Sequence, residues 1–333
     1  MRTLSIGING FGRIGRHVFK YLLEKPDVEV KAVNDLTDPA TLAHLLKWDS
    51  MHGKFPLDIT VSGEGLRVGP HEVKVIAEKN PAQLGWKALG VDLVLECTGR
   101  FRDQDSMNKH LEAGARKVLL SAPAKGDIKT VVLGVNEHVL EARDTVVSNA
   151  SCTTNCLAPM IKVLDDTYGL EEALMSTIHA YTADQNTVDG PHTDLRRART
   201  AGVNIIPTTT GAARAVGKVM PHLNGKLDGM AFRVPVAAGS ITDVVVRPRQ
   251  MPASAEAVNQ LFEQAAGNSL KGILEHSHEP LVSSDIVGNP HSCIFDAQST
   301  KVGNGLIKVV GWYDNESGYA ARLADMAVHY GRL

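Results

Sequence analysis

Short apolar runs alternate with amphipathic segments along the first half of the chain. Residues 4–35 combine an apolar strand, a glycine-rich turn, an amphipathic helix and a second strand, which together predict one βαβ unit. Further apolar runs predict strands at residues 73–77, 91–99, 117–122 and 130–135. Continuous Val and Leu runs of this kind are typical of a mostly parallel sheet covered on both faces. We therefore expect an open α/β domain here.

The turn of the first βαβ unit carries a glycine motif, Gly10-x-Gly12-x-x-Gly15, and Asp35 ends the second strand. Glycines at this spacing let the backbone approach a pyrophosphate, which the following helix N-terminus stabilises. Asp35 would accept hydrogen bonds from ribose hydroxyls, and its charge should repel a 2′-phosphate. The motif predicts a site for NAD rather than NADP; the alternative is that Asp35 merely ends a strand.

Two later strands end in small polar residues. Thr98 and Ser121 would lie at the carboxyl ends of their strands, where open α/β sheets bind ligands. Both residues are therefore candidates for the same ligand site.

Charge and composition exclude some classes of partner. With a formal net charge of −2, the 333-residue chain lacks the basic excess that general binding to nucleic acid or to an anionic membrane requires. Its apolar runs are too short to span a membrane. The N-terminus leads directly into a strand pattern and leaves no room for a signal peptide, so we expect four reduced cysteines in a cytoplasmic protein. We expect no metal site.

The stretch SNASCTTNC, residues 148–156, places Cys152 near the predicted start of a helix. A helix N-terminus favours the thiolate form of cysteine, so we expect a lowered pKa. His179 ends a strand-like segment and could act as the base of a Cys/His pair, although the sequence alone does not bring the two together. Pro159 is best accommodated if the helix has only its first turns there.

Cys156 lies one helical turn beyond Cys152. The spacing is not that of a zinc site, and a disulfide within one helix would be strained. We interpret Cys156 as a packed small residue.

The motifs now carry a resemblance. From about residue 3 to the C-terminus, the chain resembles the phosphorylating, glycolytic glyceraldehyde-3-phosphate dehydrogenases in the order and spacing of seven motifs. These motifs are INGFGRIGR, VNDLTD, ECTGRF, SAPAKGD, SNASCTTNCLAP, NIIPTTTGAARAVGKVMPHLNGKLDGMAFRVP and WYDNESGY. The resemblance implies oxidation of D-glyceraldehyde 3-phosphate to 1,3-bisphosphoglycerate with NAD and inorganic phosphate. Cys152 would form a hemithioacetal and then a thioester, and its own backbone N–H would serve as oxyanion donor. His179 would pair with the thiolate and move protons.

The resemblance also implies two anion sites. The aldehyde's phosphate is expected at Thr182, Asp184 and Arg233, with Asp184 orienting Arg233. The attacking phosphate is expected at Ser151, Thr153, Thr210 and Gly211, with either Arg196 or Arg197. Hydroxyls, a glycine N–H and guanidinium groups are the kinds of group that bind phosphate well.

For the cofactor, the resemblance adds Arg13 and Ile14 in the glycine turn, Lys79, Ser121, Asn315 and Tyr319. Ser317 departs from the family's common forms, where tryptophan or threonine is usual. The packing under the nicotinamide is therefore left open.

The domain organisation follows from the same comparison. Residues 1–150 should form a Rossmann dinucleotide-binding domain, completed by the C-terminal helix 317–333, and residues 151–316 an α+β catalytic domain with a large, mostly antiparallel sheet. The polar stretch at about residues 181–205 lacks regular periodicity, and long loops of this kind are functional or buried in an interface. In the family it packs at the core of a homotetramer.

Several alternatives remain open at this point. The scaffold could act on erythrose 4-phosphate or run reductively with NADPH, which Thr182, Asp184 and Asp35 disfavour. A semialdehyde dehydrogenase would replace phosphate by a carboxylate. Binding of RNA or other proteins as the main role finds no support in the charge.

Overall fold

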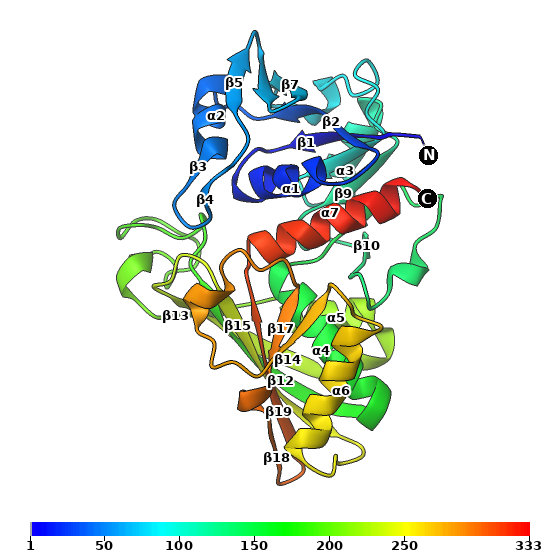
Figure 1. Ribbon diagram of the computed structural model, residues 1–333, viewed down its shortest axis with the longest axis vertical. Coiled ribbons are helices and arrows are strands. Elements are labelled where there is room, and N and C mark those ends of the chain that lie inside the picture. Colours follow the sequence, from blue (N-terminus) through cyan, green and yellow to red (C-terminus); the bar gives the residue numbers. More distant parts are fainter. Residues whose placement is uncertain (1) are drawn as a thin grey trace. The chain divides into compact units, whose positions relative to one another are not determined.

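The computed structural model describes residues 2–333, which form two compact units. The first unit contains the chain up to Val131, together with His138–Ala150 and Ala320–Leu333. The second contains Val132–Glu137 and Ser151–Tyr319. Figure 1 shows the strands and helices of both units.

A nine-stranded sheet forms the centre of the first unit. Its order is β10 (Lys129–Thr130), β11 (Val146–Ser148), β9 (Lys117–Leu120), β8 (Leu93–Glu96), β1 (Leu4–Asn9), β2 (Val28–Asn34), β7 (His71–Ile76), β6 (Gly65–Val68) and β5 (Ile59–Ser62). Neighbours from β10 to β7 pair in parallel, and β7, β6 and β5 pair antiparallel. The mostly parallel sheet expected from the apolar runs is confirmed.

Helices α1 (Arg13–Leu23) and α3 (Gln104–Glu112) make the crossovers on the two sides of β1. The first leads from β1 to β2 and the second from β8 to β9, in opposite directions along the sheet. Right-handed crossovers in opposite directions place their helices on opposite faces. Because both faces are covered, β8 and β9 are buried along their whole length.

The first unit also contains two more α-helices and a pair of short strands. Helix α2 (Pro39–Lys47) begins at Asp38, whose side chain accepts the Thr41 N–H, and the short β3 (Trp48–Asp49) and β4 (Gly53–Lys54) pair with each other. The last helix, α7 (Ser317–Gly331), runs beside α1 in Figure 1, and Lys25 Nζ lies 2.5 Å from Asp325 Oδ1.

A second, eight-stranded sheet forms the second unit. Its order is β13 (Ile206–Thr209), β14 (Leu227–Val234), β12 (Leu170–Ala180), β15 (Ser240–Pro248), β19 (Leu306–Tyr313), β17 (Cys293–Asp296) and β16 (Leu274–Ser277), with β18 (Lys301–Gly303) paired to β19. Only β12 with β14 and β16 with β17 are parallel, so the expected mostly antiparallel sheet is also confirmed.

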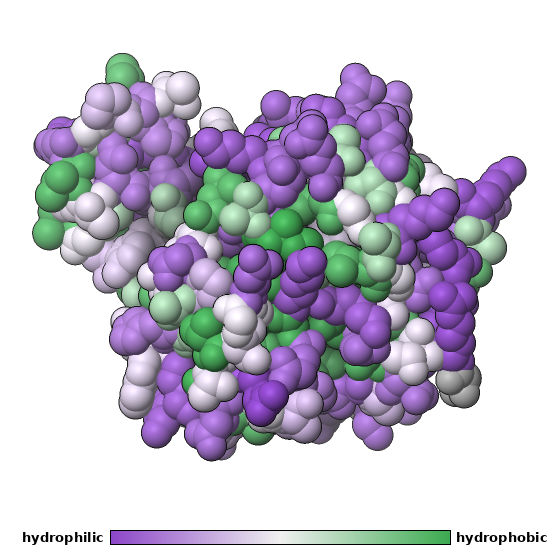
Figure 2. Space-filling model, turned by 90° about the horizontal axis from the view of Figure 1, so that it is seen from above, coloured by the Kyte–Doolittle hydropathy of each residue, from purple (hydrophilic) through white to green (hydrophobic). Residues whose placement is uncertain are grey.

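Helices α4 (Cys152–Tyr168), α5 (Ala212–Val219) and α6 (Ala255–Gly267) cover one face of this sheet (Figure 1). Strand β12 alternates accordingly: Ala173 and Met175 are buried, whereas Leu174 on the other face is 68% exposed. Polar side chains cover much of the surface drawn in Figure 2, with apolar residues between them. No helix among residues 2–333 is long and apolar enough to cross a membrane.

Two local expectations were wrong. The strand expected at residues 130–135 ends at Thr130, because Asn136 Oδ1 accepts the Val132 N–H at 2.8 Å and Gly134 takes a φ of 81°, which turns the chain. Helix α4 does not stop after its first turns; it continues through Pro159 to Tyr168.

Candidate active site

Cys152 is the first residue of α4. The preceding Ser151 caps the helix in an extended conformation, its hydroxyl accepting the Thr154 N–H at 3.1 Å. Before it, Ala150 has a φ of 56°, in the left-handed region that residues with a Cβ rarely adopt. Unusual backbone of this kind concentrates at functional sites, and here it directs the chain into the helix that carries the thiol.

His179 lies near the end of β12, and its Nε2 atom is 3.4 Å from Cys152 Sγ. Its Nδ1 atom lies 2.6 Å from the carbonyl oxygen of Ala180, which can only accept, and 3.2 Å from Arg233 Nη1, which can only donate; the shorter contact, to Ala180, assigns the ring proton to Nδ1. Nε2 is thereby left to accept a proton from the thiol. Ser240 fixes the strand end, because its hydroxyl accepts the Ala180 N–H at 3.0 Å.

Tyr313, for which the sequence predicted no role, packs against the His179 ring of the Cys152–His179 pair. Its ring meets the ring of His179 edge-on at 5.9 Å, and its hydroxyl lies 2.8 Å from the hydroxyls of both Thr153 and Thr177. All three hydroxyl-bearing residues are buried. The apolar run at residues 307–313 could have signalled a buried tyrosine, but not its partners.

The protonation of the pair differs from the expectation. Burial raises the pKa of the Cys152 thiol, although the charge of Arg233 and hydrogen bonds from Thr153 oppose that rise. Burial and the same Arg233 lower the pKa of His179 to about 3. These directions oppose the lowered thiol pKa expected from the helix N-terminus and favour a neutral thiol beside a neutral imidazole.

The other cysteines have no such partner. Cys156 and Cys293 are fully buried, which agrees with the interpretation of Cys156 as a packed residue. Burial raises the pKa of Cys97 to about 12.

Arg233 stands beside His179 because the parallel register of β12 and β14 aligns the two residues. Its Nη1 atom donates to the hydroxyl of Thr182 at 3.0 Å and to the carbonyl of Ala180 at 3.1 Å. Its Nε atom is buried and finds no acceptor among the residues the structure describes. A buried guanidinium N–H without an acceptor fits a site for an anion.

Asp184 pairs with a different arginine than expected. Its carboxylate accepts from Arg197 Nη1 and from the hydroxyl of Thr182, so it reaches Arg233 only through Thr182. Its expected role in orienting Arg233 would therefore act through Thr182. Arg197 Nε also donates to Thr208 at 3.0 Å. Arg196 is exposed, and its hydrogen bonds among the described residues are made by its backbone, to Asp194 and Arg199. Of the two candidate arginines, the fold brings Arg197 to the site.

The four residues expected at the attacking phosphate lie at the beginnings of two helices. Ser151 and Thr153 begin α4, and Thr210 and Gly211 precede α5, which packs against α4. The Thr210 hydroxyl accepts the Ala212 N–H at 3.2 Å. The Thr153 hydroxyl lies 2.8 Å from the Tyr313 hydroxyl in the core.

Five of the eight cofactor residues expected in the first unit line a pocket of about 520 Å³. Gly10, Gly12, Asp35, Lys79 and Thr98 line it, together with residues that the sequence analysis did not single out: Asn9, Asn34, Leu36, Glu78, Cys97, Arg100 and Phe101. The Asp35 carboxylate accepts the N–H groups of Phe11 at 2.9 Å and Thr37 at 3.0 Å. These bonds hold the carboxylate at the pocket wall.

The glycines of the motif differ in what surrounds them. A Cβ at Gly10, where φ is 91°, would lie 2.7 Å from Thr98 N, and one at Gly15 would lie 2.1 Å from Gly10 O. A Cβ at Gly12 would meet no atom within 4 Å and would project into open space at the pocket. This cradle fits a dinucleotide, whose pyrophosphate needs backbone without a side chain.

The remaining cofactor candidates are dispersed. Arg13 and Ile14 begin α1, and Arg13 Nη1 lies 2.7 Å from Asp49 Oδ2. Ser121 follows β9 and does not line the pocket. In the second unit, Asn315 Oδ1 accepts from the Ser240 hydroxyl at 2.9 Å, and Tyr319 is buried.

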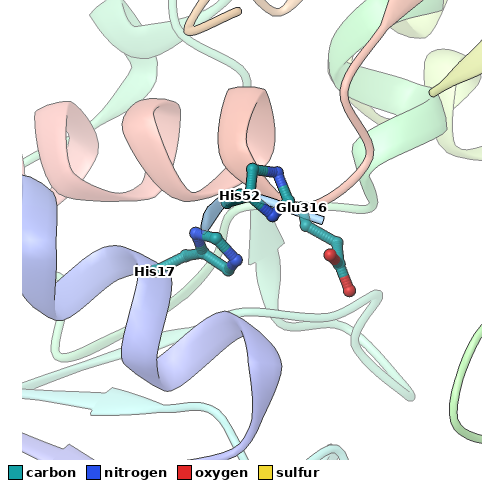
Figure 3. Close-up of side chains that lie close together, drawn as sticks. All are labelled: His17, His52 and Glu316. Atoms are coloured by element: carbon teal, nitrogen blue, oxygen red, sulfur yellow. The ribbon is translucent and has the colours of Figure 1, made fainter. Parts of the chain in front are cut away.

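A pair of histidines adjoins Asp49 in the first unit. The ring centroids of His17 and His52 lie 4.3 Å apart, and the rings meet edge-on. Figure 3 draws both rings and Glu316, which belongs to the second unit. His17 Nε2 and His52 Nδ1 lie 3.5 Å and 3.4 Å from the Asp49 carboxylate, which Arg13 also binds. We interpret this cluster as structural support for the start of α1.

Comparison with known proteins gives one consistent result. Residues 4–104 match the family described as "Glyceraldehyde 3-phosphate dehydrogenase, NAD binding domain", and residues 151–315 match "Glyceraldehyde 3-phosphate dehydrogenase, C-terminal domain". The chain is 54% identical to a glyceraldehyde-3-phosphate dehydrogenase of Mycobacterium avium over 99% of both chains. It is 53% identical to one of Mycobacterium bovis and 51% identical to glyceraldehyde-3-phosphate dehydrogenase 1 of Streptomyces avermitilis, again over 99% of both chains.

Proposed function

The chain belongs to the glyceraldehyde 3-phosphate dehydrogenase family, and from this premise we propose that it oxidises D-glyceraldehyde 3-phosphate to 1,3-bisphosphoglycerate with NAD and inorganic phosphate. It is an NAD-dependent oxidoreductase of glycolysis and gluconeogenesis. The observation that carries the proposal is the 3.4 Å contact between Cys152 Sγ and His179 Nε2.

The first step is attack of Cys152 Sγ on the aldehyde carbon. Because the resting pair is neutral, His179 Nε2 takes the thiol proton as the S–C bond forms, and the Nδ1–H bond to Ala180 keeps the ring in the required tautomer. The product is a hemithioacetal on Cys152. Its oxygen lies at the beginning of α4, where the Cys152 N–H and the helix dipole favour negative charge.

NAD, when bound, supplies the two-electron acceptor that turns this hemithioacetal into a thioester. The pocket lined by Gly10, Gly12, Asp35, Lys79 and Thr98 would hold its adenosine and pyrophosphate parts. Arg13 and Ile14 follow Gly12 in the sequence, and the Ser121 N–H donates to the carbonyl of Glu96 at 3.0 Å, so we assign all three to the same cofactor. We assign Asn315 and Tyr319 to the nicotinamide side. His179 Nε2 would first return the thiol proton to the hemithioacetal oxygen, which gives the hydroxyl, and would accept that proton again in the oxidation step.

Two anion sites complete the reaction. We assign the phosphate of the aldehyde to Arg233 and Thr182, with Asp184 positioning Arg197 beside them; the unbonded Arg233 Nε supports this assignment. Inorganic phosphate would bind between Ser151, Thr153, Thr210 and Gly211, with Arg197 as the arginine of this site, and attack the thioester carbon. The Cys152 thiolate then leaves and recovers its proton from His179 Nε2.

We also propose a cytoplasmic homotetramer. The four cysteines are free, which suits a reducing compartment. The 181–205 segment exposes Val188, Leu195, Val203 and Ile205 by 69–81%, and an apolar surface of this extent on a loop favours burial in an interface.

An assay matrix tests the proposal. NADH formation is measured with glyceraldehyde 3-phosphate or erythrose 4-phosphate, with NAD⁺ or NADP⁺, and with or without phosphate. We expect sustained turnover only with glyceraldehyde 3-phosphate, NAD⁺ and phosphate together. Faster turnover with erythrose 4-phosphate, or turnover independent of phosphate, would refute the assignment.

A further inference from the structure

A buried carboxylate lies under the cofactor pocket without lining it. Glu96 ends β8, and its side chain is fully buried. Its Oε2 atom accepts hydrogen bonds from Asn9 Nδ2 at 2.5 Å and from the ring of His110, whose Nε2 is 3.1 Å away. Its Oε1 atom accepts the N–H of Thr98 at 2.7 Å and the Thr98 hydroxyl. Four donors therefore converge on one carboxylate.

The orientation of His110 is fixed from its other side. Trp86 Nε1, which can only donate, lies 3.1 Å from His110 Nδ1. Nδ1 must therefore accept, and the ring proton resides on Nε2, where it points at Glu96. Trp86 and His110 are both fully buried, so water cannot replace either bond.

From Glu96 the network reaches the pocket by two routes. Thr98 lines the pocket itself. Along the other route, Asn9 Oδ1 accepts from Asn34 Nδ2 at 2.7 Å, and the Asn34 amide bonds the backbone N–H and C=O of Glu78, each at 2.9 Å. Asn9, Asn34 and Glu78 also line the pocket.

We propose that Glu96 is a positioning residue for the adenosine part of the dinucleotide. Resting on the function proposed above, the inference is that Glu96 fixes both Thr98 and the Asn9–Asn34 pair, and so holds two walls of the pocket in the binding geometry before the cofactor arrives. The residue touches no part of the cofactor, and its effect passes through the side chains that do. Preorganisation of this kind lowers the cost of ordering the site on binding.

A carboxylate at position 96 is needed to satisfy this hydrogen-bond network, because each oxygen of Glu96 faces only donors. In Glu96→Gln the new NH₂ group would face either Asn9 Nδ2 and His110 Nε2, or the Thr98 N–H. His110 cannot yield by moving its proton to Nδ1, because Trp86 donates there. A donor opposed by a donor in a buried network disturbs the groups on both sides.

The test compares Glu96→Gln with a control on the same helix as His110. Met107 is fully buried in α3, in an apolar cluster that does not contain Trp86. Met107→Ala should therefore lower the melting temperature without removing a hydrogen bond of the Glu96 network. Isothermal titration measures the Kd of NAD⁺ and of ADP-ribose, which lacks the nicotinamide. For Glu96→Gln we expect both Kd values to rise about tenfold or more, a size set by the cost of opposed buried donors, and for Met107→Ala we expect them unchanged.

A kinetic split accompanies the titration. The KM for NAD⁺ should rise in Glu96→Gln, while the KM for glyceraldehyde 3-phosphate and the rate of Cys152 alkylation stay at the wild-type level. Should Glu96→Gln fail to fold, Trp86→Phe decides: it removes the N–H that holds His110 together with part of a buried ring, and Met107→Ala controls for the lost packing. The Kd of ADP-ribose should rise about threefold.

The possible failures are distinguishable. Wild-type protein that binds neither NAD⁺ nor ADP-ribose would overturn the proposed function together with this inference. Wild-type binding that Glu96→Gln, or Trp86→Phe in its place, leaves unchanged would overturn the inference alone. A loss of affinity in Met107→Ala equal to that in Glu96→Gln would reduce Glu96 to a contributor to stability and overturn it as well.

Discussion

His179 Nε2 lies 3.4 Å from Cys152 Sγ, with its opposite ring nitrogen held by the carbonyl of Ala180. The contact joins the end of a central strand to the first residue of a helix, 27 positions apart in the chain. Burial disfavours the charged form of both groups, so it favours a neutral pair over a preformed ion pair. In the neutral pair, His179 Nε2 can accept the proton of the Cys152 thiol.

The first prediction concerns the thiol. Iodoacetamide should label Cys152 before the buried Cys156 and Cys293, and activity should fall in step with one thiol per chain. Because burial raises the pKa of Cys152, the labelling rate should still be rising above about pH 8.5, the ordinary thiol value. Peptide mapping by mass spectrometry, taken beside residual activity, checks both points.

Removing the base should separate binding from chemistry. His179→Asn should lower kcat by about 10²- to 10⁴-fold, the usual contribution of a positioned general base, and should slow alkylation of Cys152. The Kd of NAD⁺ should not change, since His179 belongs to the second unit and the adenosine pocket to the first. An unaltered kcat would contradict the assigned role.

Cofactor choice should depend on Asp35. Placing a 2′-phosphate against its carboxylate should cost roughly 3 kcal/mol, so kcat/KM should favour NAD⁺ over NADP⁺ by at least about 100-fold. Asp35→Gly removes the charge and also the acceptor for the Phe11 and Thr37 N–H groups. The preference should then narrow about tenfold or more, with weaker binding of NAD⁺. Equal use of both cofactors by the wild type would refute the ribose assignment.

Stability in acid should depend on Asp49. Burial alone would raise the pKa of Asp49, but hydrogen bonds from His17 and from the His52 and Met51 N–H groups, with the charge of Arg13, hold it well below the ordinary value. A depressed carboxyl pKa stabilises the fold above the unfolded value near about 4, and this contribution is lost as pH falls toward the folded value.

The matching experiment is denaturant unfolding of Asp49→Asn at several pH values. We expect the variant to be about 1–2 kcal/mol less stable at pH 7, the scale of hydrogen bonds to a charged group, with a shrinking difference below about pH 4. A difference that grows toward acid pH would have the wrong sign and would contradict the assignment.

The oligomer can be tested at the 181–205 segment. Leu195 is 81% exposed, so Leu195→Asp should not unfold the isolated chain but should weaken an interface that buries it. Light scattering after size exclusion should give the mass of four chains for the wild type and a smaller mass for the variant. Val61→Asp, on β5 of the first unit where Val61 is 46% exposed, is the matched control. A wild-type monomer would rule out the tetramer.

Local patterns were enough to predict the βαβ unit. The positions of the motif glycines and Asp35 depend on the backbone geometry of one such unit, so their spacing in the sequence was enough to predict a shared site. The pocket contains Gly10, Gly12 and Asp35. The strand position of His179 followed from apolar alternation in the same way. Its approach to Cys152 was a hypothesis that only the fold could confirm.

Features that depend on distant partners were missed. The choice of Arg197 over Arg196 requires Asp184 and Thr208, which lie 13 and 11 positions away along the chain. The raised pKa of Cys152 reflects burial by the whole unit, which outweighs the local effect of the helix start. Tyr313 and Glu96 look like ordinary strand residues until their hydrogen-bond partners arrive from other elements.

The central claim is that Cys152 carries the acyl group during turnover. Protein mixed with glyceraldehyde 3-phosphate and NAD⁺ without phosphate should release one NADH per active chain and then stall, and mass spectrometry should find a 3-phosphoglyceroyl thioester on the peptide containing Cys152. Added phosphate should remove the acyl group and restart turnover. An acyl group on another residue, or a stalled enzyme with unmodified Cys152, would contradict the account.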